Sequence, residues 1–166
     1  MSKIAGIYWD DTAAAPGISL SVYFSGCHFH CPGCHNPEAW DFNYGKEFTS
    51  DKLQEIISKL RKNNVERRIS ILGGEPLCDE NLADVALLIN SVKTIYPDTL
   101  IYVWTGYTYE ELIKRNIPLL WNILKQVNVL IDGRYEQDKR DITLPLRGST
   151  NQRVIYLENG NVKQIL

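Results

Sequence analysis

The residues best suited to chemistry are concentrated in one short stretch, Gly26 to Trp40, which reads GCHFHCPGCHNPEAW. It contains three of the four cysteines of the chain and all three histidines. Cys27, Cys31 and Cys34 follow the spacing C-x3-C-x2-C. Thiolates and imidazoles are ligands for zinc and for iron–sulfur clusters, and a thiolate is also a nucleophile. This stretch is therefore expected to bind a metal, to form a disulfide or to react.

The spacing favours an iron–sulfur cluster over the other two uses. The beginning of the chain has no signal-peptide pattern, so we expect a cytoplasmic protein, in which thiols stay reduced. A structural zinc site normally draws two ligand pairs from separated segments, and no second pair follows here, although a histidine could be a fourth ligand. Three cysteines on a four-iron cluster would leave one iron open for chemistry, as on a catalytic zinc.

The composition is that of an ordinary globular protein, and 166 residues suffice for a single domain over residues 1–166. Hydrophobic residues make up 44% of the chain and charged residues 23%, and no apolar run approaches the length that spans a bilayer. A net charge of -2 gives no electrostatic reason to bind nucleic acid or an anionic membrane. We therefore expect neither as a partner.

Apolar runs that alternate with helical patterns predict an α/β fold. The runs at 19–24, 68–72, 100–104, 127–131 and 154–157 read as strands. Helices are expected from Ser50 or Asp51 to residue 60, over 82–95, after a Thr108–Glu111 capping box, and within 117–127. Near-continuous apolar strands separated by helices predict a mostly parallel sheet. Because there are too few units for eight, we expect a partial (βα) barrel.

Four of these strands are followed by polar or glycine-rich sequence. The cysteine stretch follows the first, GGEP (73–76) the second, TGY (105–107) the third and DGRY (132–135) the fourth. The carboxyl ends of parallel strands meet at one edge of a sheet, where binding sites form. We therefore expect an active site at this edge.

The C-x3-C-x2-C motif after a strand, with GGEP one βα unit later, resembles the radical S-adenosylmethionine (radical SAM) enzymes. The resemblance implies a [4Fe-4S] cluster on Cys27, Cys31 and Cys34. The open iron would bind the amino and carboxylate groups of SAM, and the reduced cluster would cleave it to methionine and a 5′-deoxyadenosyl radical.

The resemblance also implies which residues bind SAM. Gly73, Gly74 and Glu75 are expected at its methionine moiety, with strand-end N–H and C=O groups free for the ammonium. The adenine is expected at the backbone of Gly33, Cys34 and His35.

Two further strand-end residues are candidates for the site. Thr105 is expected to face the cofactor. Asp132 is expected either to act on SAM, a cation or an incoming substrate loop, or to form an Asx-turn. Cys78 lies outside the triad spacing and is expected to be a partly buried free thiol.

Longer segments resemble one family of radical SAM enzymes, the activating proteins of anaerobic ribonucleoside-triphosphate reductase. These segments are SGCHFHCPGCHNPEAW, VWTGYTYEEL (103–112), VLIDGRYEQD (129–138) and LRGSTNQR (146–153). The resemblance implies hydrogen abstraction from a glycine of the large reductase subunit, with a flavodoxin-type electron donor. Residues 147–153 would dock the reductase or hold a lid, and the segment up to Pro16 would contribute little. A homodimer is compatible with this reading.

Two alternatives stay open at the level of sequence. A radical SAM enzyme acting on a small molecule, such as a deazaguanine synthase, would need a closed substrate pocket. A non-enzymatic, zinc-stabilised binding module would leave the GGEP segment without a role.

Overall fold

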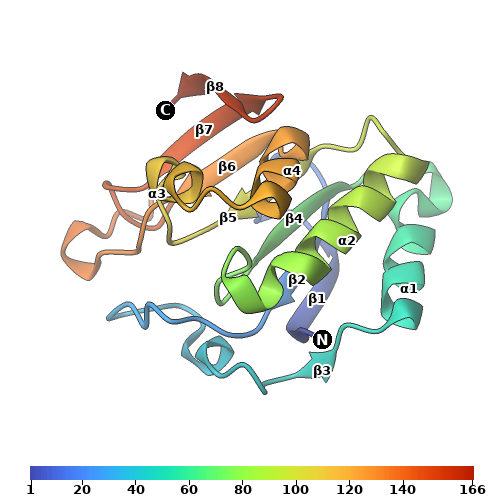
Figure 1. The fold of residues 1–166 in the computed structure, drawn as a ribbon, viewed down its shortest axis with the longest axis horizontal. Coiled ribbons are helices and arrows are strands. Elements are labelled where there is room, and N and C mark those ends of the chain that lie inside the picture. Colours follow the sequence, from blue (N-terminus) through green and yellow to red (C-terminus); the bar gives the residue numbers. More distant parts are fainter.

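The computed structural model describes residues 1–166, which form one eight-stranded sheet with the order β3-β1-β2-β4-β5-β6-β7-β8 (Figure 1). The strands are β1 Lys3–Asp11, β2 Ser19–Phe24, β3 Lys46–Glu47, β4 Arg68–Gly73, β5 Ile101–Trp104, β6 Val129–Asp132, β7 Arg153–Glu158 and β8 Asn161–Ile165. The helices are α1 Ser50–Leu60, α2 Asp79–Ile95, α3 Tyr109–Lys114 and α4 Pro118–Gln126. Single 3-10 turns occupy Pro37–Trp40, Lys62–Asn64 and Gln137–Lys139.

The centre of the sheet is parallel and its margins are antiparallel. Strands β2, β4, β5 and β6 pair in parallel, whereas β1, β3, β7 and β8 pair antiparallel with their neighbours. The expected mixed α/β fold with a mostly parallel central sheet is confirmed. All five predicted strands are present, but β1, β3 and β8 were not predicted.

The two faces of the sheet have different environments, because successive side chains of a strand point to opposite sides. Leu20, Val22 and Phe24 of β2 belong to the main core with residues of α1, α2 and α4. Figure 1 shows these helices together on one face of the sheet. Tyr102 and Ile131 belong to a separate, smaller cluster. The opposite face is thus free of helices and available for a site.

Two helix starts show how local sequence sets the boundaries. The N-cap of α1 is Thr49, whose hydroxyl accepts a hydrogen bond from the N–H of Lys52 at 3.2 Å. The expected start at Ser50 is therefore confirmed, and the N-cap is the residue before it. The capping box at α3 is confirmed: the N–H of Glu111 donates to Thr108 Oγ1, and the N–H of Thr108 donates to the Glu111 carboxylate.

The long connections after β2 and β6 project from the same side of the molecule (Figure 1). This is the side where the parallel strands end, as the sequence predicts. Separately, none of the helices is long and apolar enough to cross a membrane.

Adjacent leucines of α2 test the layer arrangement. Leu88 is fully buried in the main core, and Leu87 is 47% exposed. Leu88→Ala should lower the free energy of unfolding by about 2–5 kcal/mol, because it leaves a cavity in the core. Leu87→Ala should change it by about 0.5 kcal/mol or less. Urea denaturation followed by circular dichroism measures both, and equal losses would contradict the assigned helix face.

Candidate active site

The cysteine loop, residues 26–40, follows β2, and backbone hydrogen bonds join its first residues to its last ones. The N–H of Gly26 donates to Ala39 O at 2.7 Å, and the N–H of Cys27 donates to Trp40 O at 3.1 Å. Between them, the backbone turns at Pro32-Gly33, where the N–H of Cys34 donates to Cys31 O. The loop therefore closes into a compact unit.

Gly33 is required for this turn. Its φ is +77°, in the left-handed region, and a Cβ there would lie 2.1 Å from Oε1 of Gln137. The loop can therefore approach the segment after β6 closely.

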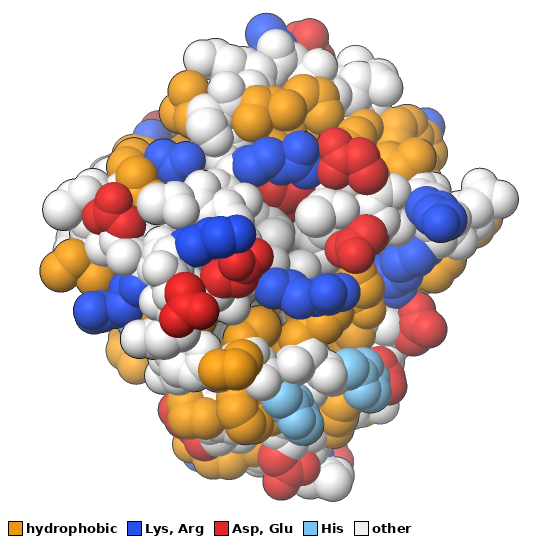
Figure 2. All heavy atoms as spheres, turned by 90° about the vertical axis from the view of Figure 1, so that its left-hand side faces the viewer, with side chains coloured by type: hydrophobic (Ala, Val, Ile, Leu, Met, Phe, Trp, Pro, Cys, Tyr) orange, Lys and Arg blue, Asp and Glu red, His pale blue; other side chains and the backbone are white.

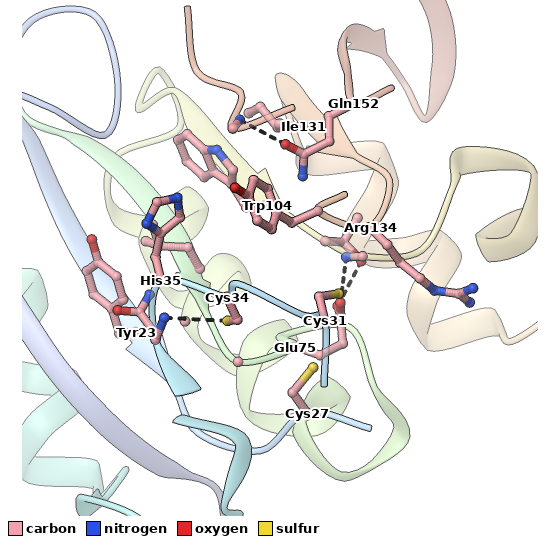
Figure 3. Close-up of a pocket in the computed structure, with 18 of the residues that line it drawn as sticks. Tyr23, Cys27, Cys31, Cys34, His35, Glu75, Trp104, Ile131, Arg134 and Gln152 are labelled. Carbon is pink, nitrogen blue, oxygen red and sulfur yellow. Dashed lines mark hydrogen bonds between the residues drawn. The ribbon is translucent and has the colours of Figure 1, made fainter. Parts of the chain in front are cut away.

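The three cysteines of the motif line one pocket of about 660 Å³ on the helix-free side of the sheet (Figure 3). Cys27 is buried, and Cys31 and Cys34 are half-buried. Burial raises the pKa of Cys27 and of Cys31, and backbone N–H groups oppose that rise. The N–H of Asn36 donates to Cys34 Sγ at 3.4 Å. N–H groups directed at sulfur stabilise thiolate ligands of a cluster.

The donor set fits a cluster better than a single ion. No group of three His, Cys, Asp or Glu side chains is close enough to hold one metal ion. The thiols are instead arranged around a shared pocket, as ligands of different irons would be. Two of the neighbouring histidines have other contacts: His30 stacks on Trp40 at 4.6 Å, and His28 Nε2 lies 2.7 Å from Glu80 Oε1.

Glu75 of the GGEP segment is buried at the base of the pocket, near Cys27 and Cys31 (Figure 3). Burial raises its pKa to about 7, against the effect of three hydrogen bonds to the carboxylate. The N–H of Gly106 donates to it at 2.7 Å, the N–H of Leu77 at 2.9 Å and the Thr105 hydroxyl at 2.7 Å. A carboxylate accepts about four hydrogen bonds, so Glu75 retains capacity for one more donor.

The backbone of the GGEP segment is less available than expected. The N–H of Gly74 donates to Phe24 O at 2.8 Å, and the N–H of Glu75 donates to Gly26 O at 2.7 Å. The expectation that these N–H groups are free was therefore wrong, because β4 is tied to the end of β2. The carbonyl oxygen of Gly74 accepts no hydrogen bond and remains open to an ammonium group.

The glycines explain the close approach of these two strand ends. A Cβ at Gly73 would lie 2.3 Å from Phe24 O, and one at Gly74 would lie 2.5 Å from Gly26 O. Only glycine permits both contacts. Gly73, Gly74, Glu75 and Thr105 all line the pocket together with Gly106.

Asn81, in the first turn of α2, was missed by the sequence analysis. Its buried amide donates to Ser25 O and to Glu75 O, each at 3.0 Å. It therefore links the cysteine loop to the GGEP segment. A polar residue among the apolar positions of a helix is the signal that could have identified it.

Asp132 is not brought into the pocket. Its carboxylate accepts hydrogen bonds from the N–H of Tyr109 at 2.7 Å and from Arg153 Nε at 3.0 Å. Arg153 also pairs with Glu110, which lowers the pKa of Glu110. Asp132 is thus buried between the start of α3 and the start of β7.

His35 and the segment after β6 meet at the pocket. The His35 and Tyr135 rings lie 5.5 Å apart, and both residues line the pocket with Gly148 and Gln152. Figure 3 places Gln152 and Trp104 across the pocket from the cysteines. Sequence reasoning found His35 but not Tyr135 or Gln152 individually.

The N-terminal segment contributes more than expected. Tyr8, Asp11, Ala13 and Ala14 line the pocket, because β1 pairs with β2 beside it. Asp11 accepts a hydrogen bond from the Ser21 hydroxyl at 2.7 Å. The expectation that residues up to Pro16 play little part was wrong, since antiparallel pairing of this strand was not foreseen.

Phe29, between the first two cysteines, joins the loop to the next strand ends. Its ring lies 4.8 Å from that of Tyr107 and 4.3 Å below the Arg134 guanidinium. Such cation–π contacts stabilise by about 0.5–1 kcal/mol at exposed sites.

Cys78 differs from the other three cysteines. It is buried and lies outside the pocket lining, and burial raises its pKa to about 12. A thiol with so high a pKa stays protonated, which agrees with the expected free thiol.

The strand-end pocket, its three convergent cysteines and the mixed α/β fold define a protein class that carries one iron–sulfur cluster. The family model of the 4Fe-4S single cluster domain matches residues 13–155. The activating protein of anaerobic ribonucleoside-triphosphate reductase from Escherichia coli K12 is 36% identical over 148 residues, which cover 89% of this chain and 94% of that protein. The protein of the same name from Vibrio cholerae is 37% identical over 86% of this chain and 90% of that protein. The one from phage T4 is 34% identical over 89% of this chain and 90% of that protein.

The chain therefore belongs to the family of anaerobic ribonucleoside-triphosphate reductase-activating proteins. The resemblance noted from the sequence is confirmed at this level.

The buried Glu75 predicts a pH effect on stability. Its pKa is raised in the folded protein, so the folded state binds the proton more tightly than the unfolded state. The stabilisation is fully present below the unfolded value near 4.5 and is lost as pH rises towards 7. As the pH rises from 4.5 to about 7, the free energy of unfolding should therefore decrease more in the wild type than in Glu75→Gln. Parallel pH profiles for the two proteins would contradict a buried, protonatable Glu75.

Asp132→Asn tests the assignment of Asp132 to the scaffold. The new amide places a donor opposite the Arg153 or Tyr109 donor, so the free energy of unfolding should fall by about 1–3 kcal/mol. SAM affinity of the reconstituted protein should not change, because Asp132 lies outside the pocket. Asp138→Asn, at an exposed position, is the control. A tenfold loss of SAM affinity with unchanged stability would contradict this assignment and would indicate that Asp132 contacts SAM.

Proposed function

We propose that this protein is an activating enzyme that uses a [4Fe-4S] cluster and SAM to form a glycyl radical on anaerobic ribonucleoside-triphosphate reductase. The observation that carries the proposal is the convergence of Cys27, Cys31 and Cys34 on the pocket that the GGEP strand end also lines. The names of the relatives supply the substrate protein. The cluster, once bound and reduced, supplies the electron that cleaves SAM.

Some residues of the site would bind the cluster or SAM, and others would orient those residues. Cys27, Cys31 and Cys34 would each hold one iron of the cluster. Glu75 and the Gly74 carbonyl oxygen offer acceptors for the SAM ammonium, since each has unused hydrogen-bonding capacity. Thr105 acts on Glu75 through its hydroxyl rather than on the cofactor directly.

The adenine is assigned to the side of the pocket with aromatic and backbone groups. Gly33, Cys34 and His35 border Tyr135 there, and Trp104 lies on the sheet face. Aromatic surfaces favour stacking with a planar base. Asp132 is assigned to the scaffold.

The pocket lies on a face of the protein where a protein substrate can approach. Figure 2 shows this face. Basic and acidic side chains lie on its upper part, the histidines of the cysteine loop lie below, and hydrophobic surface lies between them. A volume of about 660 Å³ falls within the range of about 300–1,000 Å³ typical for small-ligand sites. We take the large reductase subunit to insert its glycine loop here.

Several finer features follow from the proposed activity. The chain has no second cysteine cluster, so a flavodoxin-type donor would deliver electrons from outside. Residues 1–166 would act as one radical SAM domain, which agrees with the single eight-stranded sheet. In this domain the sheet would form a partial barrel. We place the protein in the cytoplasm, where reduced thiols persist, and a homodimer is compatible with this account.

The alternatives have less support. A small-molecule radical SAM enzyme such as a deazaguanine synthase would share the cysteines and GGEP, but relatives aligned over most of the chain are named activating proteins. A zinc module does not explain the polar residues at the ends of four neighbouring strands.

Cys31 and Cys78 form a matched pair for the test. Cys31→Ala should lose the cluster, because it removes one of three ligands, whereas Cys78→Ala should keep it. After anaerobic reconstitution, iron content is measured first. SAM, dithionite and a candidate reductase are then added, and the glycyl doublet is recorded by electron paramagnetic resonance.

Wild type and Cys78→Ala should give the doublet, and Cys31→Ala should not. A cluster and SAM cleavage without a doublet in the wild type would contradict the partner. A protein that binds zinc and forms no cluster would contradict the whole proposal.

A further inference from the structure

The connection between β6 and β7, residues 133–152, forms one wall of the pocket. Tyr135, Leu146, Arg147, Gly148 and Gln152 of this connection line the pocket. Apart from one 3-10 turn and one isolated antiparallel bridge between Arg140 and Ser149, the wall has no helix or strand. Its position depends on individual hydrogen bonds.

Gln152 makes the largest number of these bonds. Its Nε2 donates to Gly133 O at 2.9 Å, and its Oε1 accepts from the N–H groups of Gly148 at 2.8 Å and Ser149 at 3.2 Å. One side chain therefore joins the first residue of the wall to its returning end.

Asn151 and Ser149 extend the same pattern. Asn151 Nδ2 donates to Arg134 O at 2.7 Å, and Ser149 Oγ accepts from the N–H of Glu136 at 3.2 Å. We call these bonds of Ser149, Asn151 and Gln152 the wall clamp. The bonds to Gly133, Arg134 and Glu136 join side chains of GSTNQ to the backbone of GRYE, about fifteen residues earlier, and the two bonds of Gln152 Oε1 lie within GSTNQ.

The wall clamp sets Tyr135 against the cysteine loop. A Cβ at Gly148 would lie 3.1 Å from the Tyr135 ring on one side, and a Cβ at Gly33 would lie 3.3 Å from it on the other. The ring also lies 5.5 Å from that of His35. The wall thus contacts the loop that carries the cluster ligands.

We propose that Ser149, Asn151 and Gln152 are positioning residues that fix the wall so that the glycine of a protein substrate reaches the site of SAM cleavage. The inference rests on the proposed function. The clamp side chains bond to backbone, except that Asn151 Oδ1 is buried without a hydrogen-bond partner. The other wall residues that line the pocket are Gly133, Arg134, Tyr135, Leu146, Arg147 and Gly148. The cysteine loop and the GGEP strand end have backbone hydrogen bonds of their own, so loosening the clamp should leave them in place.

The consequence is uncoupling rather than loss of cofactor chemistry. With a displaced wall, SAM is still cleaved, but the 5′-deoxyadenosyl radical takes its hydrogen atom less often from the glycine and more often from another C–H group of protein or buffer. A displacement of about 1 Å by a remote substitution can reduce a rate by about 10²-fold. The ratio of glycyl radical to 5′-deoxyadenosine reports this directly.

The test compares Gln152→Ala and Asn151→Ala with Gln164→Ala, which changes an exposed glutamine of β8. Each full-length protein is reconstituted, and iron content, SAM cleavage and glycyl radical are measured with the reductase. Radical per 5′-deoxyadenosine should fall by about tenfold or more in both clamp variants. Asn151→Ala, which changes a residue outside the pocket lining, should keep iron content and SAM cleavage within about twofold of wild type. Hydrogen exchange of cluster-free Gln152→Ala should be faster within residues 133–150, and Gln164→Ala should match wild type in every measurement.

Gln152→Glu keeps the acceptor for Gly148 and Ser149 but removes the donor to Gly133 O. It should fall between wild type and Gln152→Ala, and it replaces the alanine variant if that one fails to fold. An unchanged radical ratio, or SAM cleavage that falls in proportion to the radical, would overturn the role of the clamp. Absence of the radical in the wild type, with normal SAM cleavage, would instead overturn the proposed function and this inference with it.

Discussion

The carboxylate of Glu75, buried between the ends of β4 and β5, is the interaction on which the rest of the site depends. A buried carboxylate is costly unless hydrogen bonds compensate for the lost water. Thr105 and Gly106 supply two of these bonds from the end of β5, and Leu77 supplies the third. Asn81 then connects the same region to Ser25 at the start of the cysteine loop. Three strand ends are thus joined around one acidic group, and the cysteines are carried on the first of them.

The local features of the site could be predicted from the sequence. The three cysteines of the motif lie within eight residues of one another, and this short spacing predicted that they would meet at one pocket. The parallel strands were found because each is a short apolar run between helices. The glycines of GGEP were also informative, since the close contacts of Gly73 and Gly74 with the end of β2 exclude any side chain.

Features that depend on distant pairing could not be predicted. Asp132 sits at a strand end like a ligand, but Arg153, twenty-one residues later, draws its carboxylate away from the pocket. The contribution of Tyr8 and Asp11 depends on β1 pairing with β2, and the exposed residues of β8 give no alternating pattern that would reveal a strand. The role of GSTNQ required knowledge of which backbone groups its side chains meet.

The site combines a base, formed by the glycine-dependent contacts between the ends of β2 and β4, with a wall that side chains hold in place. In the proposed activity, the base would hold the cofactors and the wall would face the substrate, so that SAM cleavage and the choice of hydrogen donor depend on different residues. The most direct test of the central claim is transfer of deuterium from a reductase labelled with deuterated glycine. Mass spectrometry should find one deuterium in the 5′-deoxyadenosine formed with the labelled reductase and none with the unlabelled protein. Unlabelled 5′-deoxyadenosine in both reactions would show that the hydrogen comes from elsewhere and would contradict a glycyl-radical activase.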